Sequence, residues 1–109
     1  MPRLVVALLL AAVSLSAGQR RQTFIGAITD SQCARDGHAS MRMGPTDAEC
    51  TVACIIAHGA VYVLADGKEV YILSDQQTPE AFAAQQVRVV GTLDAKTKTI
   101  QVESITAVE

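Results

Sequence analysis

Short runs of β-branched and aromatic residues, separated by turn residues, occupy much of the chain after residue 22. These runs cover residues 23–29, 60–64, 69–73, 87–93 and 99–105. Such residues fit the pleated, half-buried surface of a sheet, so each run is predicted to be a strand. Asp66-Gly67 between the second and third runs is a strong hairpin-turn signal. A second hairpin is predicted to join the last two runs.

One segment, residues 47–58, has the signals of an α-helix. Thr46 is a favourable N-cap, and Glu49 three residues later completes a capping box. Gly59 follows the last expected turn, where glycine readily adopts the left-handed conformation that ends many helices. Residues 32–45, just before this helix, show no regular period and are predicted to form a loop.

Two irregularities in the last strands predict that the sheet is strongly curved. Gly91, inside the fourth run, indicates a sharp bend or the close approach of another backbone segment. In the fifth run Ile100 and Val102 alternate with polar residues, but Ile105 falls out of step. That shift predicts a β-bulge near Ser104.

The order of the elements predicts the fold class. Five strands, with a short helical turn from Thr78 between the third and fourth, match the layout of a small OB-like barrel. The helix over residues 47–58 would then be an insertion between the first and second strands. The same strands could also form a small β-sandwich or an open sheet. We favour the barrel, mainly β with one or two short helices, because a bend and a bulge curve a sheet.

The first 18 residues have the pattern of a secretory signal peptide. Arg3 provides a positive start, residues 4–13 form an apolar run, and small residues lead to Gly18, where we place the cleavage. The run is shorter than the about 20 apolar residues of a membrane-spanning helix. We therefore expect residues 19–109 to be a single exported domain, periplasmic or secreted, with no membrane anchor after cleavage.

Charge and motif content exclude several classes of function. The chain has 9 basic and 11 acidic residues, whereas binding nucleic-acid phosphates requires a basic face. Two Tyr, two Phe and no Trp leave few rings to stack on bases. The sequence contains no phosphate-binding loop, nucleophile elbow, His-Glu-x-x-His zinc motif or haem-attachment motif. We therefore predict a non-enzymatic binding module whose partner is a protein or a small ligand.

The feature of the sequence that most indicates a specific chemistry is one segment that contains all three cysteines and both histidines. Its residues are Cys33, His38, Met41, Met43, Cys50, Cys54 and His58. Cys50, Cys54 and His58 are spaced i, i+4, i+8, which places them along one stripe of the predicted helix. Cys33 and His38 precede that helix closely enough to fold over the stripe. The candidate metal ligands are Cys33, His38, Cys50, Cys54 and His58.

Three interpretations of this segment are open, and a structural disulfide ranks first because small exported domains commonly use cysteine in that way. Cys33 paired with Cys54 would close a loop of about 21 residues and stabilise by about 3 kcal/mol. Cys33 paired with Cys50 is nearly equivalent. Cys50 paired with Cys54 is poorest, since positions i and i+4 hold Cβ atoms about 5–6 Å apart and a disulfide needs about 3.8 Å. One thiol is left over in every pairing.

A soft-metal site ranks second, and thiol redox chemistry in the cell envelope ranks third. Thiolate and imidazole donors suit copper(I) or zinc(II), and three cysteines with one histidine would complete a tetrahedral set. The Cys50-x3-Cys54 spacing resembles the copper-binding motif of Sco-type copper chaperones, although no proline follows Cys54. In the redox interpretation the odd thiol would exchange with a neighbouring disulfide. The Cys-x-x-Cys spacing of thioredoxin-like enzymes is absent from the sequence.

Several spaced motifs resemble those of a family of small exported bacterial proteins of unknown function. The matching positions are Gly26-x-Ile28-x-Asp30-Ser31-x-Cys33, His38, Met41, Cys50-x3-Cys54, Gly59-x-x-Tyr62-Val63-Leu64 and Val89-x-Gly91-x-Leu93. The resemblance covers nearly all of residues 19–109, and the Cys and His spacing is its specific part. It implies an exported OB-like domain and singles out Cys33, His38, Cys50 and Cys54, with His58 a less clear family position. It implies no particular activity.

Overall fold

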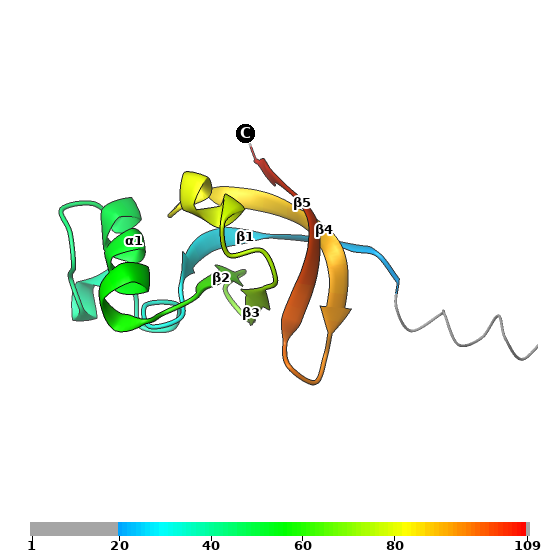
Figure 1. Cartoon of the computed structure of the whole chain (residues 1–109), viewed down its shortest axis with the longest axis horizontal. Helices are drawn as coiled ribbons and strands as arrows, with labels where there is room; N and C mark the ends of the chain where they lie inside the picture. Colours follow the sequence, from blue (N-terminus) through cyan, green and yellow to red (C-terminus); the bar gives the residue numbers. More distant parts are fainter. Residues whose placement is uncertain (1–19, 109) are drawn as a thin grey trace, which may run out of the picture.

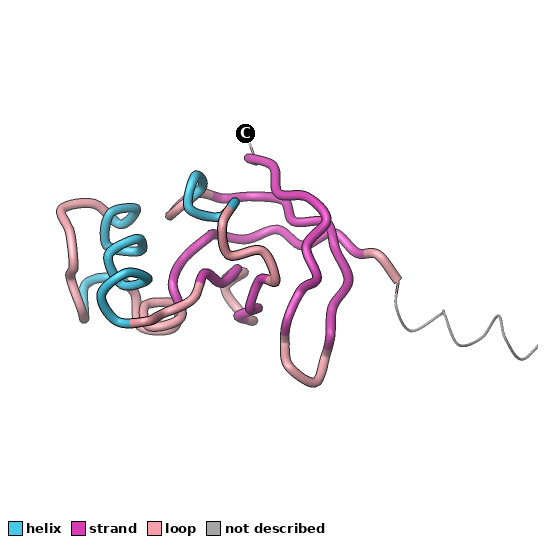
Figure 2. The backbone as a smooth tube through the Cα atoms, viewed as in Figure 1, coloured by secondary structure: helices cyan, strands magenta, loops and turns pink. Residues whose placement is uncertain are grey.

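The computed structural model describes residues 20–108 and shows a mainly β protein with one α-helix (Figures 1 and 2). Its elements are β1 (Gln22–Asp30), the 3-10 helix η3 (His38–Ser40), α1 (Asp47–His58), β2 (Tyr62–Ala65), β3 (Val70–Leu73), the 3-10 helix η4 (Thr78–Phe82), β4 (Gln86–Asp94) and β5 (Thr99–Ala107). The predicted signal peptide, residues 1–18, lies outside the described residues. None of the helices in the described part is long and apolar enough to cross a membrane.

The five strands form one sheet that closes on itself in a ring. Their order is β1-β2-β3-β5-β4, and β4 pairs back with β1. Neighbouring strands are antiparallel except for the parallel pair β3 and β5. Strand β1 allows the closure because Gln22 to Ala27 pair with β4, while Ala27 to Asp30 pair with β2. The prediction of a mainly β, closed arrangement is confirmed, and the open sheet is not observed.

The interior of the ring is a core of aliphatic side chains and one tyrosine. Its buried members are Ile28, Tyr62, Leu64, Leu73, Val87, Val89 and Ile100, each at most 2 % exposed. Burying a side chain of this size stabilises a protein by about 1.5–3 kcal/mol. The ring core is therefore expected to contribute most of the stability of the fold.

The predicted bend and bulge are both present where β4 and β5 meet. A Cβ atom on Gly91 would overlap the backbone oxygen of Gln101 in β5, so the two strands approach too closely for any side chain there. Val90 pairs with Ser104 and Gly91 with Val102, which leaves Glu103 as the additional residue of the bulge. Both features curve the sheet towards closure.

Replacing Gly91 by alanine is expected to destabilise the protein by about 1–3 kcal/mol, because the new methyl group overlaps the carbonyl oxygen of Gln101. Urea unfolding followed by circular dichroism measures the change. Arg88→Ala, at an exposed position of the same strand, is the control and should change stability by about 0.5 kcal/mol or less. Equal unfolding midpoints for Gly91→Ala and the wild type would contradict the close approach.

Helix α1 begins and ends where the sequence predicts. The side-chain oxygen of Thr46 accepts a hydrogen bond from the backbone N–H of Glu49 (3.1 Å), and Gly59 is left-handed with a φ of 67°. The buried residues of the helix are Cys50, Thr51 and Cys54. The helix follows β1 in the chain and lies beside the end of β1, away from the β4–β5 hairpin (Figure 1).

Candidate functional site

The three cysteines form a small buried cluster of their own, separate from the core of the ring. Cys33, Cys50 and Cys54 are each at most 4 % exposed and pack with Ala60. Met43 and Ile55 are partly buried against them. The cluster lies between α1 and the segment that leaves the end of β1, so its position depends on both elements.

Asp30 positions Cys33. It is the last residue of β1, pairs with Tyr62 of β2 and is fully buried. Its Oδ2 atom accepts hydrogen bonds from the backbone N–H groups of Gln32 (3.1 Å) and Cys33 (3.0 Å). This is an Asx turn, in which an aspartate side chain bonds the backbone two and three residues on. The turn leads the chain out of the sheet and places Cys33 beside the carboxylate.

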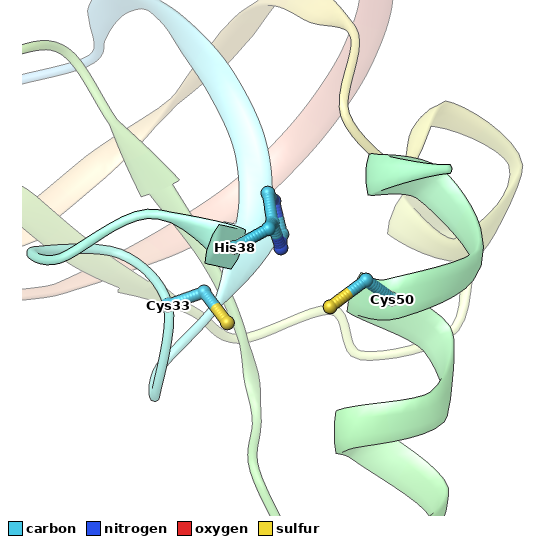
Figure 3. Close-up of side chains that lie close together, drawn as sticks. All are labelled: Cys33, His38 and Cys50. Atoms are coloured by element: carbon cyan, nitrogen blue, oxygen red, sulfur yellow. The ribbon is translucent and has the colours of Figure 1, made fainter. Parts of the chain in front are cut away.

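A second turn brings His38 back to the cluster. The carbonyl oxygen of Cys33 accepts a hydrogen bond from the N–H of Gly37 (2.9 Å). Gly37 has a φ of 77°, which glycine adopts without the steric penalty of other residues. His38 follows at the start of η3, and Figure 3 shows its imidazole directed into the space between the sulfur atoms of Cys33 and Cys50.

Helix α1 contributes Cys50 and Cys54, one turn apart on its buried side. The backbone N–H of Met43 donates a hydrogen bond to the Sγ atom of Cys50 (3.3 Å), and the Cys50 thiol donates to the carbonyl oxygen of Met41 (3.4 Å). These two bonds tie the loop before the helix to the Cys50 sulfur.

Two sets of three potential metal ligands share Cys33. The ligand atoms of Cys33, His38 and Cys50 all lie within 4.8 Å of one another, and so do those of Asp30, Cys33 and Cys54. Donor atoms about 2.0–2.3 Å from a zinc ion lie within such a distance of each other. The arrangement is therefore compact enough to surround a cation.

The member of each set that is not a cysteine has a buried donor atom with no hydrogen-bond partner. Four such side-chain atoms occur in the described part of the chain: Asp30 Oδ1, His38 Nδ1, Thr51 Oγ1 and Tyr62 OH. Leaving a buried polar atom unsatisfied is unfavourable, and a bound cation is one way to satisfy it. Asp30 and His38 thus each have an unpartnered polar atom, and each belongs to one of the two sets that share Cys33.

The thiols are poorly solvated. Burial raises the pKa of the Cys33 thiol to about 12, and the charge of the nearby Asp30 carboxylate acts in the same direction. Burial likewise raises the pKa of the Cys54 thiol, again with a contribution from Asp30. Both thiols are therefore protonated at neutral pH in the metal-free protein, and a bound cation would displace their protons.

Of the five predicted ligands, the structure brings four together and leaves His58 outside both sets. His58 is exposed at the C-terminal end of α1. Eight residues exceed two turns of 3.6 residues each, so His58 is rotated by about 80° from Cys50 around the helix axis. That rotation carries its side chain away from the buried stripe.

Asp30 is the potential ligand that the sequence did not identify. An aspartate after a strand is usually a solvated turn former, and Asp30 does form a turn, but it is fully buried. The signal in the sequence is the spacing Asp30-x-x-Cys33. Because an Asx turn bonds the N–H of the third residue on, it holds that residue next to the carboxylate.

All three cysteines are free thiols in the structure. The sulfur atoms of Cys50 and Cys54 each lie within 4.8 Å of that of Cys33. A disulfide requires a separation of about 2.05 Å, so either pairing would draw two sulfurs together. The disulfide of Cys33 with Cys54 or Cys50 remains a prediction.

Comparison with protein-family models, curated proteins and solved structures finds no match to this chain. The resemblance to small exported bacterial proteins therefore also remains a prediction. The function has to be inferred from the site itself.

Proposed function

We propose that this protein is an exported, non-enzymatic metal-binding module that holds one soft or borderline cation, zinc or copper. The observation that carries the proposal is the buried gathering of three thiols, an imidazole and a carboxylate, the last two with unpartnered donor atoms. Buried polar groups are normally hydrogen-bonded or bound to a metal. Among the three interpretations of the cysteines, this geometry favours the metal site over the disulfide that ranks first on sequence grounds.

The proposal includes an OB-like barrel as the scaffold. The ring order β1-β2-β3-β5-β4 and the position of η4 between β3 and β4 support this identity. The segment that contains η3 and α1 is then an insertion between β1 and β2. The role of the barrel is to hold the end of β1 rigid, since metal ligands need a fixed supporting frame.

The proposed ligands come from separate elements. Cys33 and His38 lie in the loop after β1, whereas Cys50 and Cys54 lie on α1. An ion that binds residues of both segments would hold α1 against the barrel. Part of the binding free energy then becomes folding free energy of the inserted segment.

The envelope thiol-redox alternative has less support. A thiol that exchanges with a disulfide must be accessible and must reach its thiolate form. Cys33, Cys50 and Cys54 are all buried, and the pKa values of Cys33 and Cys54 are raised. A copper- or zinc-handling role in the envelope fits the same site and differs from storage only in whether the ion is passed on.

Removing the metal is expected to lower the free energy of unfolding by about 4 kcal/mol when the free ion is at about 1,000 times its Kd. The protein is isolated from the periplasm of an expression host and its metal content is determined by native mass spectrometry. Urea unfolding is then compared with and without a chelator.

The same mass measurement separates the metal site from the alternatives. A bound zinc or copper ion with all three thiols reduced supports the proposal. A metal-free protein that is two hydrogens lighter than the reduced chain, with one free thiol, would instead establish a binding module cross-linked by one disulfide. Export is tested in the same sample, because cleavage after Gly18 leaves a chain that begins at Gln19.

A further inference from the structure

We infer that the site takes a divalent, borderline cation of the zinc(II) class in preference to copper(I), and that Asp30 is one of its ligands. The inference rests on the proposed metal-binding function. It adds the charge of the ion and a ligand supplied by the sheet rather than by the loop or the helix.

The carboxylate of Asp30 is held in place by hydrogen bonds to one of its oxygens, and its other oxygen accepts none. Its Oδ2 atom accepts from two backbone N–H groups, those of Gln32 and Cys33, which fixes the orientation of the carboxyl group. Its Oδ1 atom is buried and has no hydrogen-bond partner among the described residues. A ligand oxygen of Asp30 lies within 4.8 Å of the sulfur atoms of both Cys33 and Cys54. The free oxygen is thus available where two thiolates could meet a cation.

No lysine or arginine side chain among residues 20–108 balances the negative charge at this place, and the nearby basic residue His38 is itself a proposed ligand. The ion pairs among residues 20–108 all join exposed side chains: Arg21–Glu103, Arg42–Asp47 and Glu69–Lys98. Neither Lys nor Arg is among the groups that shift the pKa of Cys33 or Cys54. Arg42 does approach Cys50, but its guanidinium is exposed and paired with Asp47.

The charge balance favours a divalent ion. Asp30 with the thiolates of Cys33 and Cys54 would place three negative charges in a buried site. Uncompensated charge in a buried site is strongly unfavourable, and a divalent cation neutralises more of it than a monovalent one does. Copper(I) would leave two of these three charges uncompensated.

The types of donor atom favour the same ion. Zinc accepts carboxylate oxygen together with thiolate and imidazole ligands, whereas copper(I) selects soft sulfur donors. Cys33, His38 and Cys50 could bind either ion. The set of Asp30, Cys33 and Cys54 is more suitable for zinc, so Asp30 is the residue that distinguishes the two ions.

The variant Asp30→Asn tests this role with little change of shape. The amide oxygen of asparagine can still accept the hydrogen bonds of Gln32 and Cys33, but its NH2 group cannot bind a cation. Asp66→Asn is the matched control. Asp66 accepts hydrogen bonds from the N–H groups two and three residues on, those of Lys68 and Glu69, at an exposed turn.

Zinc(II) and copper(I) affinities are measured for the reduced wild-type protein and both variants by competition with chelators. Cobalt(II), a spectroscopic substitute for zinc, should give thiolate-to-cobalt charge-transfer bands in the wild type. We expect Asp30→Asn to weaken zinc binding by at least about tenfold, since even the loss of a residue that supports a ligand costs 10- to 100-fold. Its copper(I) affinity and all affinities of Asp66→Asn should match the wild type.

Three results would overturn the inference. Equal zinc affinities for the wild type and Asp30→Asn would show that Asp30 is not a ligand. A wild-type protein that binds copper(I) but neither zinc(II) nor cobalt(II) would refute the preference for a divalent ion, while the proposed metal-binding function would stand. A protein that binds none of these ions would refute both. The last two results need only the wild-type protein, so they still test the inference if Asp30→Asn does not fold.

Discussion

Cys33→Ser is expected to weaken metal binding by more than about 100-fold, beyond the range observed for residues that merely support a ligand. Cys33 belongs to both sets of potential ligands, so no complete set remains without its sulfur. Serine preserves the size of the side chain, but its hydroxyl does not ionise to supply a thiolate-like ligand. A competition titration of the reduced protein with zinc measures the loss.

Two kinds of control variant are compared with Cys33→Ser: variants of the other two cysteines and a variant of His58. Cys50→Ser and Cys54→Ser each remove a ligand from one set only and should weaken binding less than Cys33→Ser. His58→Ala removes an exposed imidazole from the same helix and should bind like the wild type. If Cys33→Ser kept the wild-type affinity while folded by circular dichroism, Cys33 could not be the shared ligand.

Leu64→Ala is expected to destabilise the metal-free protein by about 2–5 kcal/mol, the usual cost of truncating a fully buried leucine. Leu64 is completely buried in β2 and pairs with Ile28 on one side and Tyr71 on the other. Small domains have about 5–15 kcal/mol of stability in total, so this one substitution removes a large part of it. Urea unfolding in the presence of a chelator measures the effect without a contribution from metal.

The control for this substitution is Ile72→Ala on the neighbouring strand β3. Ile72 is 41 % exposed, and its truncation should cost about 1 kcal/mol or less because little buried surface is lost. Equal losses for Leu64→Ala and Ile72→Ala would mean that the interior of the ring is not the main core of this protein.

The two substitutions with the largest effects act on separate parts of the molecule. Leu64 belongs to the core of the ring, whereas Cys33 belongs to the cluster between α1 and the end of β1. We therefore expect Cys33→Ser to lose metal while keeping the sheet, and Leu64→Ala to weaken the scaffold on which the site depends.

Features governed by near neighbours in the chain could be predicted from the sequence. Helix α1 has the predicted bounds because its capping signals, Thr46 and Gly59, act within one turn of its ends. The bend at Gly91 and the bulge beside Ser104 follow from a missing side chain and a shift of alternation, which are also local. The i, i+4 spacing of Cys50 and Cys54 predicts that they share one side of the helix, and Cys33 precedes the helix closely enough in the chain to fold over that side.

Features that depend on contacts between distant residues required the tertiary structure. The pairing of β1 with both β2 and β4 closes the ring, and no local pattern specifies which distant strands will meet. The sequence marks Asp30 as a turn former, but only the packing of α1 and the loop around the end of β1 leaves its carboxylate buried with an unpartnered oxygen. Likewise, the spacing of His58 puts it about 80° from Cys50 around the helix axis, and the packing of the helix decides how much of that arc is covered; it leaves His58 exposed. Burial is a property of the whole packed molecule, and burial is what distinguishes a solvated turn residue from a potential metal ligand.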